Sequence, residues 1–323
     1  MFASGMEHAA RTEFIRDVRA GLGKTGQKEL PSSYLYDEIG AALFEAITVL
    51  PEYGLTRADA RLLESHSAEL AGKLPSSLLV SELGSGSGRK TRWILEALAA
   101  RRALHYYPID ISRTALVKCR GELGRIRGVT MEEVDQSYIE GLTSVAARRK
   151  RGQAVLVLFL GSTIGNFDRE EAQKFLTQVR ERLAPGDALL LGTDLVKPVD
   201  QLLIAYNDPI GVTAAFNLNV LARINRELGG EFMISDFEHQ AIYNRGKQRI
   251  EMYVRSKCRQ QARIREAAMT VTMEAGETIW TESSHKFRAE DVATMAQSAG
   301  FSCEAQWVDE EWPFAESLFL AVS

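Results

Sequence analysis

Leu78-Leu79-Val80-Ser81-Glu82-Leu83-Gly84-Ser85-Gly86-Ser87-Gly88 is the stretch that decides the fold of this chain. An apolar strand pattern runs into a glycine turn, and a helix pattern follows over 91–98. Glycines between a strand and a helix let a ligand approach the backbone closely, because no Cβ stands in the way. The order of strand, glycine turn and helix therefore predicts a nucleotide-binding loop at Gly84, Ser85 and Gly86.

The spacing of these glycines indicates which nucleotide the loop binds. It is G-x-G-x-G, and Arg89 stands where a dinucleotide site has its third glycine. Glu82 precedes the turn, and an acid followed by G-x-G-x-G suggests S-adenosylmethionine (SAM), which carries a positive sulfonium and no phosphate. A nicotinamide oxidoreductase is the alternative enzyme class, and tight NADH binding would favour it.

Length and composition are those of an ordinary globular chain. Its 323 residues are 45% hydrophobic and 25% charged, with a net charge of -4. That length fits one large domain or two smaller ones, and the charge gives no case for a nucleic-acid partner. Cys119, Cys258 and Cys303 show no metal spacing and suggest a reducing, cytoplasmic location. Neither a signal peptide nor a membrane-spanning stretch is apparent. We expect a cytoplasmic monomer without a bound metal or a membrane partner.

Strand and helix patterns alternate through the middle of the chain. Short apolar strands separated by helices indicate a parallel sheet covered on both faces. The expected strands are 78–83, 103–109, 129–134, 154–160 and 188–192, and the expected helices between them are 90–100, 112–123, 137–147 and 169–183. Ligands of such sheets bind beyond the carboxyl ends of the strands, so site residues are expected just after each strand.

The pattern differs before and after this alternation. Helices are expected at 13–23, 41–50, 57–74, 201–228 and 289–299, and strands at 233–243, 249–254, 269–273, 277–287, 302–308 and 317–322. The last two runs are typical of the antiparallel pair that closes many methyltransferase sheets. We predict an α/β fold, a doubly wound class I SAM-methyltransferase sheet with a second, smaller substrate-binding α+β lobe. The expected parts are 1–59 (N-terminal helices of the substrate lobe), 60–195 (SAM-binding core), 196–285 (inserted lobe) and 286–323 (C-terminal helix and strand pair of the core).

Three side chains near the ends of the expected strands are candidates for cofactor binding. Asp110 ends the second strand, where a carboxylate can accept hydrogen bonds from both ribose hydroxyls. The alternative is that Asp110 is a helix N-cap, but Ser112 suits that role better. Tyr138, beyond the third strand, either stacks on adenine or belongs to the core. Lys90 is by residue type alone a solvated lysine.

The segment 160–167 follows the fourth strand, whose end faces the methyl group in this fold. Asn166 there offers an acceptor and donors, and its amide oxygen can orient an amine without being protonated itself. Gly161 and Gly165 allow a tight backbone. The alternative for Asn166 is an Asx turn that joins strand to helix.

Eight segments together resemble the ergothioneine-pathway L-histidine Nα-methyltransferases, which are histidine-specific and SAM-dependent. In chain order they are Tyr34–Asp37, Leu50–Tyr53, Glu82–Gly86, Phe159–Asn166, Leu191–Lys197, Gly211–Asn217, Ile250–Met252 and Thr281–Phe287. The glycine loop alone is generic, but this set in this order is specific and covers nearly the whole chain. The resemblance implies an enzyme of class EC 2.1.1 that transfers three methyl groups from SAM to the α-amine of L-histidine, giving hercynine.

The resemblance also implies roles for individual residues. The histidine carboxylate and α-amine would be held by Tyr36, Gly161, Asn166 and Tyr206, of which Asn166 and Tyr36 are the catalytic candidates. The imidazole would be read by Tyr53, Glu282 and Ser284, with Met252 packed nearby. The cofactor would be held by Gly84, Lys90, Asp110, Ser137 and Tyr138, beside the loop residues Ser85 and Gly86. Lys90 thereby becomes a cofactor contact rather than a surface lysine.

Glu282 and Ser284 suit an imidazole on physical grounds as well. Residues at alternate positions of a strand point to the same side, so a carboxylate and a hydroxyl can reach both ring nitrogens. An indole has one donor and no acceptor nitrogen, which argues against the alternative substrate, tryptophan. By residue type alone, Glu282 would be a surface residue and Met252 core filler. A non-catalytic binding domain, the third alternative, fits poorly with a full set of substrate residues.

Two positions depart from the family pattern, and one function lacks a residue. Ser137-Tyr138 stand where Asp-Phe is common, a departure that concerns the adenine contacts and not the ribose contact. Gly54 replaces an aromatic residue after Tyr53, which predicts a more mobile loop or a wider pocket. No dedicated base for the amine proton is evident, and Tyr36 or water are the candidates.

Overall fold

The computed structural model describes residues 2–322, with side chains from residue 11 onward. The chain forms two units: unit 1 comprises Met1–Tyr53 and Pro198–Ser284, and unit 2 comprises Gly54–Lys197 and His285–Ser323. The first boundary lies six residues before the expected one at 59, because α3 (Leu55–Lys73) is one continuous helix whose Ala58 and Asp59 are buried. The other boundaries lie within two residues of the expected ones.

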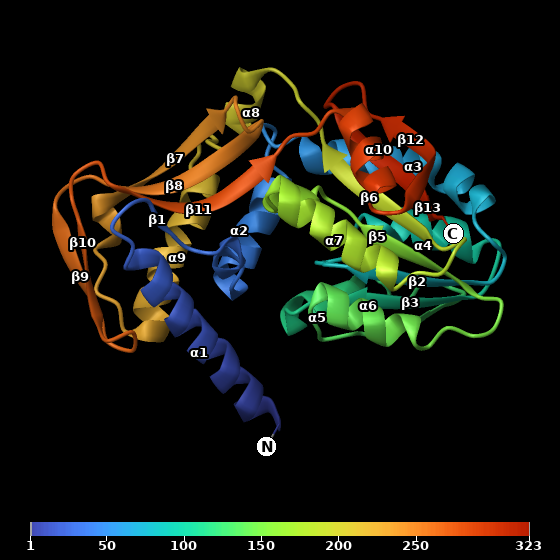
Figure 1. Cartoon of the computed structure of the whole chain (residues 1–323), viewed down its shortest axis with the longest axis horizontal. Coiled ribbons are helices and arrows are strands. Elements are labelled where there is room, and N and C mark those ends of the chain that lie inside the picture. The colour runs from blue at the N-terminus through green and yellow to red at the C-terminus, as the bar shows by residue number, and fades with distance from the viewer. Residues whose placement is uncertain (1, 323) are drawn as a thin grey trace. The chain divides into compact units, whose positions relative to one another are not determined.

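Unit 2 is built on a seven-stranded sheet in the order β12-β13-β6-β5-β2-β3-β4 (Figure 1). Its strands are β2 (Leu78–Leu83), β3 (Leu104–Ile109), β4 (Val129–Met131), β5 (Ala154–Phe159), β6 (Ala188–Asp194), β12 (Phe301–Val308) and β13 (Phe314–Ala321). Strands β2 to β6 are parallel, β13 pairs antiparallel with β6, and β12 pairs antiparallel with β13. The predicted doubly wound sheet and its closing antiparallel pair are confirmed.

Helices cover both faces of this sheet, which is why its central strands read as nearly unbroken apolar runs. On one face α3, α4 (Thr91–Ala99) and α5 (Arg113–Leu123) bury side chains such as Leu70, Leu95 and Leu123. On the other face α6 (Tyr138–Ala146), α7 (Arg169–Glu181) and α10 (Ala289–Ser298) bury Leu142, Phe175 and Val292.

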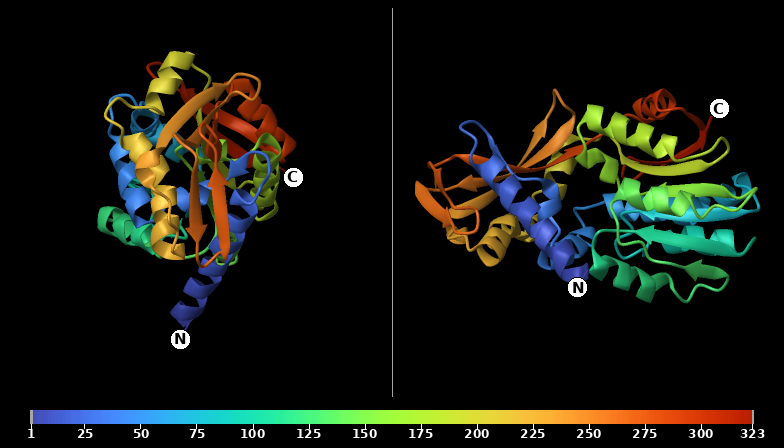
Figure 2. Two further views of the ribbon diagram at one scale, coloured as in Figure 1. Left: turned by 90° about the vertical axis from the view of Figure 1, so that its left-hand side faces the viewer. Right: turned by 60° about the horizontal axis from the view of Figure 1, so that its bottom comes forward.

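Unit 1 is an α+β unit, as the sequence predicts for the substrate lobe. Its four-stranded sheet has the order β1-β11-β8-β7, and a separate pair joins β10 to β9. The strands are β1 (Lys28–Glu29), β7 (Phe237–Asn244), β8 (Arg249–Ser256), β9 (Gln260–Ile264), β10 (Met269–Met273) and β11 (Thr278–His285). The helices are α1 (Phe2–Leu22), α2 (Glu38–Thr48), α8 (Val199–Ala205) and α9 (Val212–Leu228), and the 3-10 turns of this unit are η1 (Ser32–Leu35) and η3 (Ile234–Asp236). The 3-10 turn η2 (Thr163–Asn166) belongs to unit 2. Helix α9 packs against β7, β8 and α2 (Figure 2).

Two features of unit 1 differ from the predicted elements. The helical stretch 201–228 is two helices, because Gly211 between them adopts a left-handed φ of 80°. The Asp208 carboxylate accepts hydrogen bonds from the backbone N–H groups of Val212 (2.9 Å) and Thr213 (2.7 Å), which satisfies the first donors of α9. Strand β9 was not predicted, because its sequence Gln260–Ile264 is mostly polar. Among residues 2–322, no helix has the length and apolar character needed to cross a membrane.

Gly54 packs directly against the indole ring of Trp312. A Cβ added at Gly54 would lie 2.2 Å from Trp312 Cε3, so a larger residue would have to displace the ring. The ring is held in turn by a hydrogen bond of 3.0 Å from its Nε1 to Asp194 Oδ1. The prediction that Gly54 widens the pocket is therefore wrong, because the Trp312 indole fills the space beside Gly54.

We predict that Gly54→Ala lowers the free energy of unfolding by about 1–3 kcal/mol, the usual cost of overpacking. Denaturant unfolding followed by tryptophan fluorescence measures this change. Gly121→Ala is the matched control, because Gly121 lies within α5 and a Cβ there meets no atom within 4 Å. We expect the control to be neutral or slightly stabilising, as alanine is the better helix former. Equal effects of the two changes would contradict the packing argument.

Candidate functional site

The glycine loop joins β2 to α4 with its backbone in the left-handed region. Gly84, Gly86 and Gly88 have φ values of 70°, 52° and 71°. Residues other than glycine rarely adopt such φ values, so the loop conformation itself requires these glycines. A Cβ added at Gly86 would meet no atom within 4 Å, so the backbone of the loop is open at this position.

Asp110 is tied to this loop. Its Oδ2 accepts a hydrogen bond from Gly86 N at 3.2 Å, and its Oδ1 accepts one from Ser112 N at 2.9 Å. Ser112 is the N-cap of α5, as predicted, because its Oγ accepts from Ala115 N at 3.3 Å. A carboxylate has about four acceptor sites, so Asp110 keeps capacity for ribose hydroxyls.

Tyr138 also adjoins the loop. Its hydroxyl lies 3.0 Å from the position that a Cβ on Gly84 would take. Its ring packs edge-on against Phe159 and Phe175, at centroid distances of 5.6 and 6.1 Å. Burial raises the pKa of Tyr138 to about 12, so the phenol stays neutral. Ser137, by contrast, is exposed, and its Oγ donates to Glu140 at 2.7 Å.

Glu82 is buried at the end of β2. Thr91 Oγ1 donates to its carboxylate at 2.8 Å, and the Tyr106 hydroxyl donates to it as well. Burial raises the pKa of Glu82 to about 7, although these hydrogen bonds act in the opposite direction. Glu82 therefore links β2, β3 and the start of α4 beneath the loop.

Lys90 is an internal ion-pair partner rather than the solvated lysine that its residue type suggests. Its ammonium pairs with Asp59, whose side chain is fully buried in α3. Its Nζ lies 3.2 Å from the position that a Cβ on Gly161 would take. Lys90 thus connects the glycine loop to the turn that follows β5.

That turn is unusually tight. Gly161 and Ser162 have successive left-handed φ values of 71° and 61°, and a non-glycine residue there is uncommon. Ser162 Oγ accepts a hydrogen bond from Asp194 N at 2.8 Å, which holds the turn against β6. A Cβ on Gly165 would lie 2.9 Å from the backbone oxygen of His285. The tight backbone predicted from Gly161 and Gly165 is therefore present in this turn.

Asn166 ends this turn as the last residue of η2. Its side chain is partly exposed. Within the described part of the chain, no hydrogen bond of the Asn166 amide to another protein group occurs. The alternative interpretation as an Asx turn is therefore wrong, and the amide is available to a ligand.

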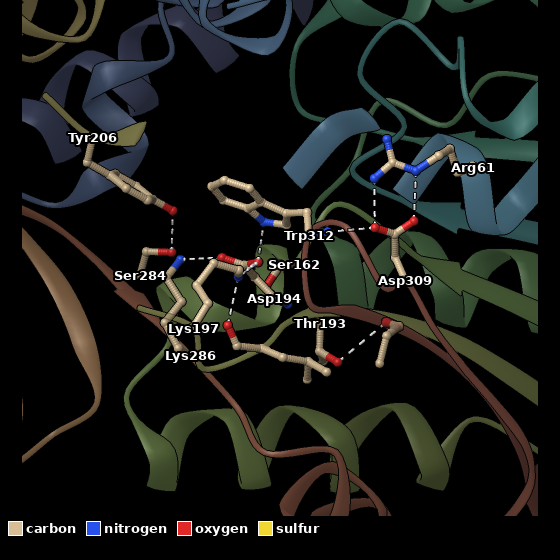
Figure 3. Close-up of polar contacts among 12 residues, drawn as sticks. Arg61, Ser162, Thr193, Asp194, Lys197, Tyr206, Ser284, Lys286, Asp309 and Trp312 are labelled. Carbon is tan, nitrogen blue, oxygen red and sulfur yellow. Dashed lines mark hydrogen bonds and ion pairs between the residues drawn. The ribbon is translucent and has the colours of Figure 1, made fainter. Parts of the chain in front are cut away.

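A buried charge cluster fixes the end of β6 (Figure 3). The Asp194 carboxylate contacts Lys197 Nζ at 2.5 Å and Lys286 Nζ at 2.8 Å. Although burial alone would raise the pKa of Asp194, these two ammonium groups hold it below its ordinary value. Burial lowers the pKa of Lys197 to about 8. In the same view, Arg61 pairs with Asp309 through two hydrogen bonds of 2.7 and 2.8 Å.

Unit 1 brings together five of the residues predicted to bind the substrate. Tyr206 donates through its hydroxyl to Ser284 Oγ at 2.8 Å (Figure 3), and Tyr36 donates to Glu282 Oε2 at 3.3 Å. The rings of Tyr53 and Tyr206 meet edge-on at 6.0 Å. Glu282 and Ser284 are both buried on β11. Three phenols, a carboxylate and a hydroxyl thus form one polar cluster.

Tyr36 acts in this cluster as a hydrogen-bond donor. Burial, and after it the Glu282 carboxylate, raises the pKa of Tyr36 well above its ordinary value. The phenol therefore keeps its proton at neutral pH, which argues against Tyr36 as a base. Its ring packs edge-on against Phe44 at 5.4 Å and Phe216 at 5.2 Å. No role was predicted for either phenylalanine from the sequence.

His239 supports Tyr206 from behind. Its Nδ1 accepts a hydrogen bond from the Asn217 amide at 2.9 Å, so its Nε2 donates to the Tyr206 backbone oxygen at 2.7 Å. Burial lowers the pKa of His239, which keeps the ring neutral. Met252, on β8, is buried, and its backbone oxygen accepts a hydrogen bond from Thr281 at 3.0 Å. No role was predicted for His239 or for Asn217, although Asn217 ends one of the segments that resemble the family.

We predict that Glu82→Gln changes how stability depends on pH. Because the folded-state pKa of Glu82 lies near 7 and the ordinary pKa of a glutamate is 4.5, the folded state binds more protons between these pH values. The wild type therefore loses stability through this group as pH rises from about 4.5 to 7. The free energy of unfolding of Glu82→Gln, relative to that of the wild type, is expected to rise by up to about 3 kcal/mol as the pH increases from 4.5 to 8.

Denaturant unfolding at both pH values measures the gain. Glu181→Gln, on the exposed end of α7, is the control and should show no such pH dependence. A Glu82→Gln offset of the same size at both pH values would refute the assignment.

Comparisons with known proteins agree with this arrangement. Residues 14–321 match the family described as "Histidine-specific methyltransferase, SAM-dependent". The chain is 43% identical over 314 residues to the histidine N-alpha-methyltransferase of Mycobacterium tuberculosis, covering 97% of this chain and 96% of that protein. It is 41% identical to the enzyme of the same name from Mycolicibacterium smegmatis, covering 94% of this chain and 93% of that protein. It is also 34% identical to ergothioneine biosynthesis protein 1 of Neurospora crassa, over 80% of this chain and 31% of that longer protein. The chain therefore belongs to the histidine-specific, SAM-dependent methyltransferases.

Proposed function

We propose that this methyltransferase transfers three methyl groups to the α-amine of L-histidine, giving hercynine, in ergothioneine biosynthesis. The observation that carries the proposal is the buried pair of Glu282 and Ser284, each joined by hydrogen bond to a tyrosine of the same unit. The histidine N-alpha-methyltransferases at 43% and 41% identity support the same substrate.

The Glu282–Ser284 pair matches the two ring nitrogens of an imidazole. The carboxylate accepts from a ring N–H, a charge-assisted bond that is stronger than a neutral one. The Ser284 hydroxyl accepts from Tyr206 and serves as donor toward the other nitrogen. Binding of a ligand that leaves such buried groups unpaired is weakened by about 1–3 kcal/mol for each group. Tryptophan, whose indole lacks an acceptor nitrogen, is therefore the poorer substrate.

The amino-acid end of the substrate would be held by Asn166 and Gly161 together with Tyr36 and Tyr206. The Asn166 amide oxygen accepts an N–H of the amine, and the lone pair of the amine stays available for attack. Because the phenol of Tyr36 keeps its proton, it serves as a donor to the carboxylate.

The cofactor site fits SAM by the geometry of its loop. Gly84, Ser85 and Gly86 would approach it through their backbone, Asp110 would bind the ribose, and Tyr138 would lie beside the adenine with Ser137 at its edge. Lys90 would bind the cofactor carboxylate. SAM supplies an activated methyl group on a sulfonium, so the residues of the chain mainly position the amine.

The proton balance sets a further requirement. In each round the nitrogen forms a bond to the methyl carbon as the carbon–sulfur bond breaks, and one proton leaves the nitrogen per methyl group. The amine also grows in each round. Gly161, which has no side chain, fits a pocket beside Asn166 that must accept this growth.

Mass spectrometry after incubation with SAM and a panel of free amino acids tests the function. We expect mass gains of one, two and three methyl groups on histidine and none on the other amino acids. Methylation of tryptophan as efficient as that of histidine would overturn the assigned imidazole pocket. Tight NADH binding without methyl transfer would overturn the reaction class.

We predict that Glu282→Gln weakens histidine recognition. Loss of a hydrogen bond to a charged group costs about 1.5–3 kcal/mol, so the KM for histidine should rise about 10- to 150-fold. The affinity for SAM, measured by calorimetry, should not change. Glu274→Gln is the matched control, because Glu274 is exposed in the turn before β11. An unchanged KM for histidine in Glu282→Gln would refute the role of Glu282.

We also propose that the enzyme works as a monomer in the cytoplasm. All three cysteines are free thiols, with Cys119 buried and Cys258 and Cys303 exposed, which suits a reducing compartment. Size-exclusion chromatography with light scattering measures the oligomeric state, and a stable dimer would contradict this proposal.

A further inference from the structure

One polar side chain of unit 1 lies where its helix is otherwise apolar. Asn217 on α9 is fully buried, and the helix continues its buried apolar stripe after it with Val220, Leu221, Ile224 and Leu228. Asparagine is a weak helix former, and a buried amide is costly unless its hydrogen bonds are satisfied. The contacts of Asn217 therefore indicate what this residue does in the fold.

The Asn217 amide bonds to three strands of the unit 1 sheet. Its Oδ1 accepts a hydrogen bond from Thr281 Oγ1 on β11 at 2.6 Å. Its Nδ2 donates to the backbone oxygen of Tyr253 on β8 at 2.9 Å and to His239 Nδ1 on β7 at 2.9 Å. One side chain of α9 thus fixes the positions of residues on β7, β8 and β11.

The backbone oxygen of Tyr253 determines the orientation of this amide and the tautomer of His239. A carbonyl oxygen only accepts hydrogen bonds, so the amide atom beside it is the nitrogen Nδ2. Because Nδ2 only donates, His239 Nδ1 is the acceptor and carries no proton. The ring proton is therefore on Nε2, which donates to the Tyr206 backbone oxygen at 2.7 Å. Burial, which lowers the pKa of His239, favours the same neutral ring.

These contacts reach both partners of the hydrogen bond between Tyr206 and Ser284 (Figure 3). On one side, Asn217 acts through His239 on the backbone of Tyr206. On the other side, Asn217 holds Thr281, which lies three residues before Ser284 on β11. The Tyr206–Ser284 pair therefore belongs to a closed circuit of hydrogen bonds and backbone that begins and ends at the Asn217 amide.

We propose that Asn217 and His239 are positioning residues, which hold Tyr206 and Ser284 where they read the imidazole nitrogen that Glu282 does not bind. Because Ser284 accepts a hydrogen bond from Tyr206, its own proton is not used in that bond and can be donated to the ring. A displaced Tyr206 would let the Ser284 hydroxyl rotate, and the site would lose a donor of fixed direction. Ligand contacts are precise when neighbouring hydrogen bonds lock the contacting side chains. This inference rests on the proposed function for the identity of the ring.

Two analogues of histidine separate this role from a general role in folding. Each isomer of pyrrolylalanine keeps one ring N–H and has a carbon in place of the other ring nitrogen. The isomer that the wild type binds more tightly keeps the contact to Glu282 and lacks the acceptor for Ser284. A misplaced Ser284 therefore weakens the binding of histidine more than the binding of this isomer, whereas a general disturbance of unit 1 weakens both equally. The ratio of the two dissociation constants isolates the contact.

Calorimetry on the full chain, saturated with the product S-adenosylhomocysteine, measures both dissociation constants. For His239→Leu, which cannot donate to Tyr206, we expect the preference for histidine over the isomer to fall about 3- to 10-fold, the scale of one neutral hydrogen bond. His239→Gln, whose amide can donate in place of Nε2, should recover most of the preference. Asn225→Leu is the control and should keep the preference, because Asn225 lies on the same helix but bonds to the Phe232 backbone at 2.8 and 2.9 Å. An unchanged preference in His239→Leu, including equal weakening of both ligands, overturns the inference.

A change on the other side of the circuit covers the case in which His239→Leu does not fold. If circular dichroism shows that His239→Leu is unfolded, Thr281→Val takes its place, because it removes the hydroxyl that bonds to Asn217 and keeps the shape of the side chain. We expect the same fall in the preference for histidine. An unchanged preference in folded Thr281→Val overturns the inference.

Nitrogen NMR of the protein, isotopically labelled at its histidines, tests the circuit without any substrate. The signals of His239 are identified by their loss in His239→Gln. We expect a neutral ring with its proton on Nε2, as the contacts to Asn217 and Tyr206 require. A proton on Nδ1 in the wild type overturns the inference. Absence of histidine methylation by the wild type would instead refute the proposed function, which the substrate-free NMR spectrum does not test.

Discussion

One buried carboxylate, Asp194, holds the carboxyl end of the sheet together. It contacts Lys197 and Lys286, and it accepts a hydrogen bond from the Trp312 indole. Its own backbone N–H donates to Ser162 in the turn after β5. Lys197 is the last residue before the chain leaves unit 2, and Lys286 lies just after the chain returns. Asp194 thus fixes the end of β6, the neighbouring turn, and the residues beside which the chain leaves unit 2 after β6 and returns to it after β11.

Glycines, which have no side chain, shape the site as much as the residues that carry one. Gly84 and Gly161 adopt left-handed conformations that side chains rarely tolerate. Gly192 leaves the space in which Glu316 reaches the Gly161 turn. Gly54 lets the Trp312 ring lie against the start of α3. Because protein interiors are packed as densely as crystals, each such absence admits one specific neighbour.

Most of the core sheet and part of the site were predictable from sequence. The parallel strands have unbroken apolar patterns, and a strand, glycine turn and helix in series is a local signal. Asp110 was predicted as a candidate site residue from its place at the end of a strand. The true environment of Lys90 was not predictable from residue type, because its partner Asp59 lies on another helix and is brought there only by folding. The prediction of one helical stretch over 201–228 merged α8 and α9, which the left-handed Gly211 separates.

The sequence by itself determined the α/β class, the glycine loop and the resemblance that names the methyl donor and the acceptor. These depend on neighbours along the chain or on motifs in order, which a one-dimensional pattern records. Only the tertiary structure decided that Lys90 pairs with Asp59 beside Gly161, and that Trp312 packs against Gly54. Those contacts join residues far apart in the chain, and their energies depend on burial and distance, which no local pattern contains.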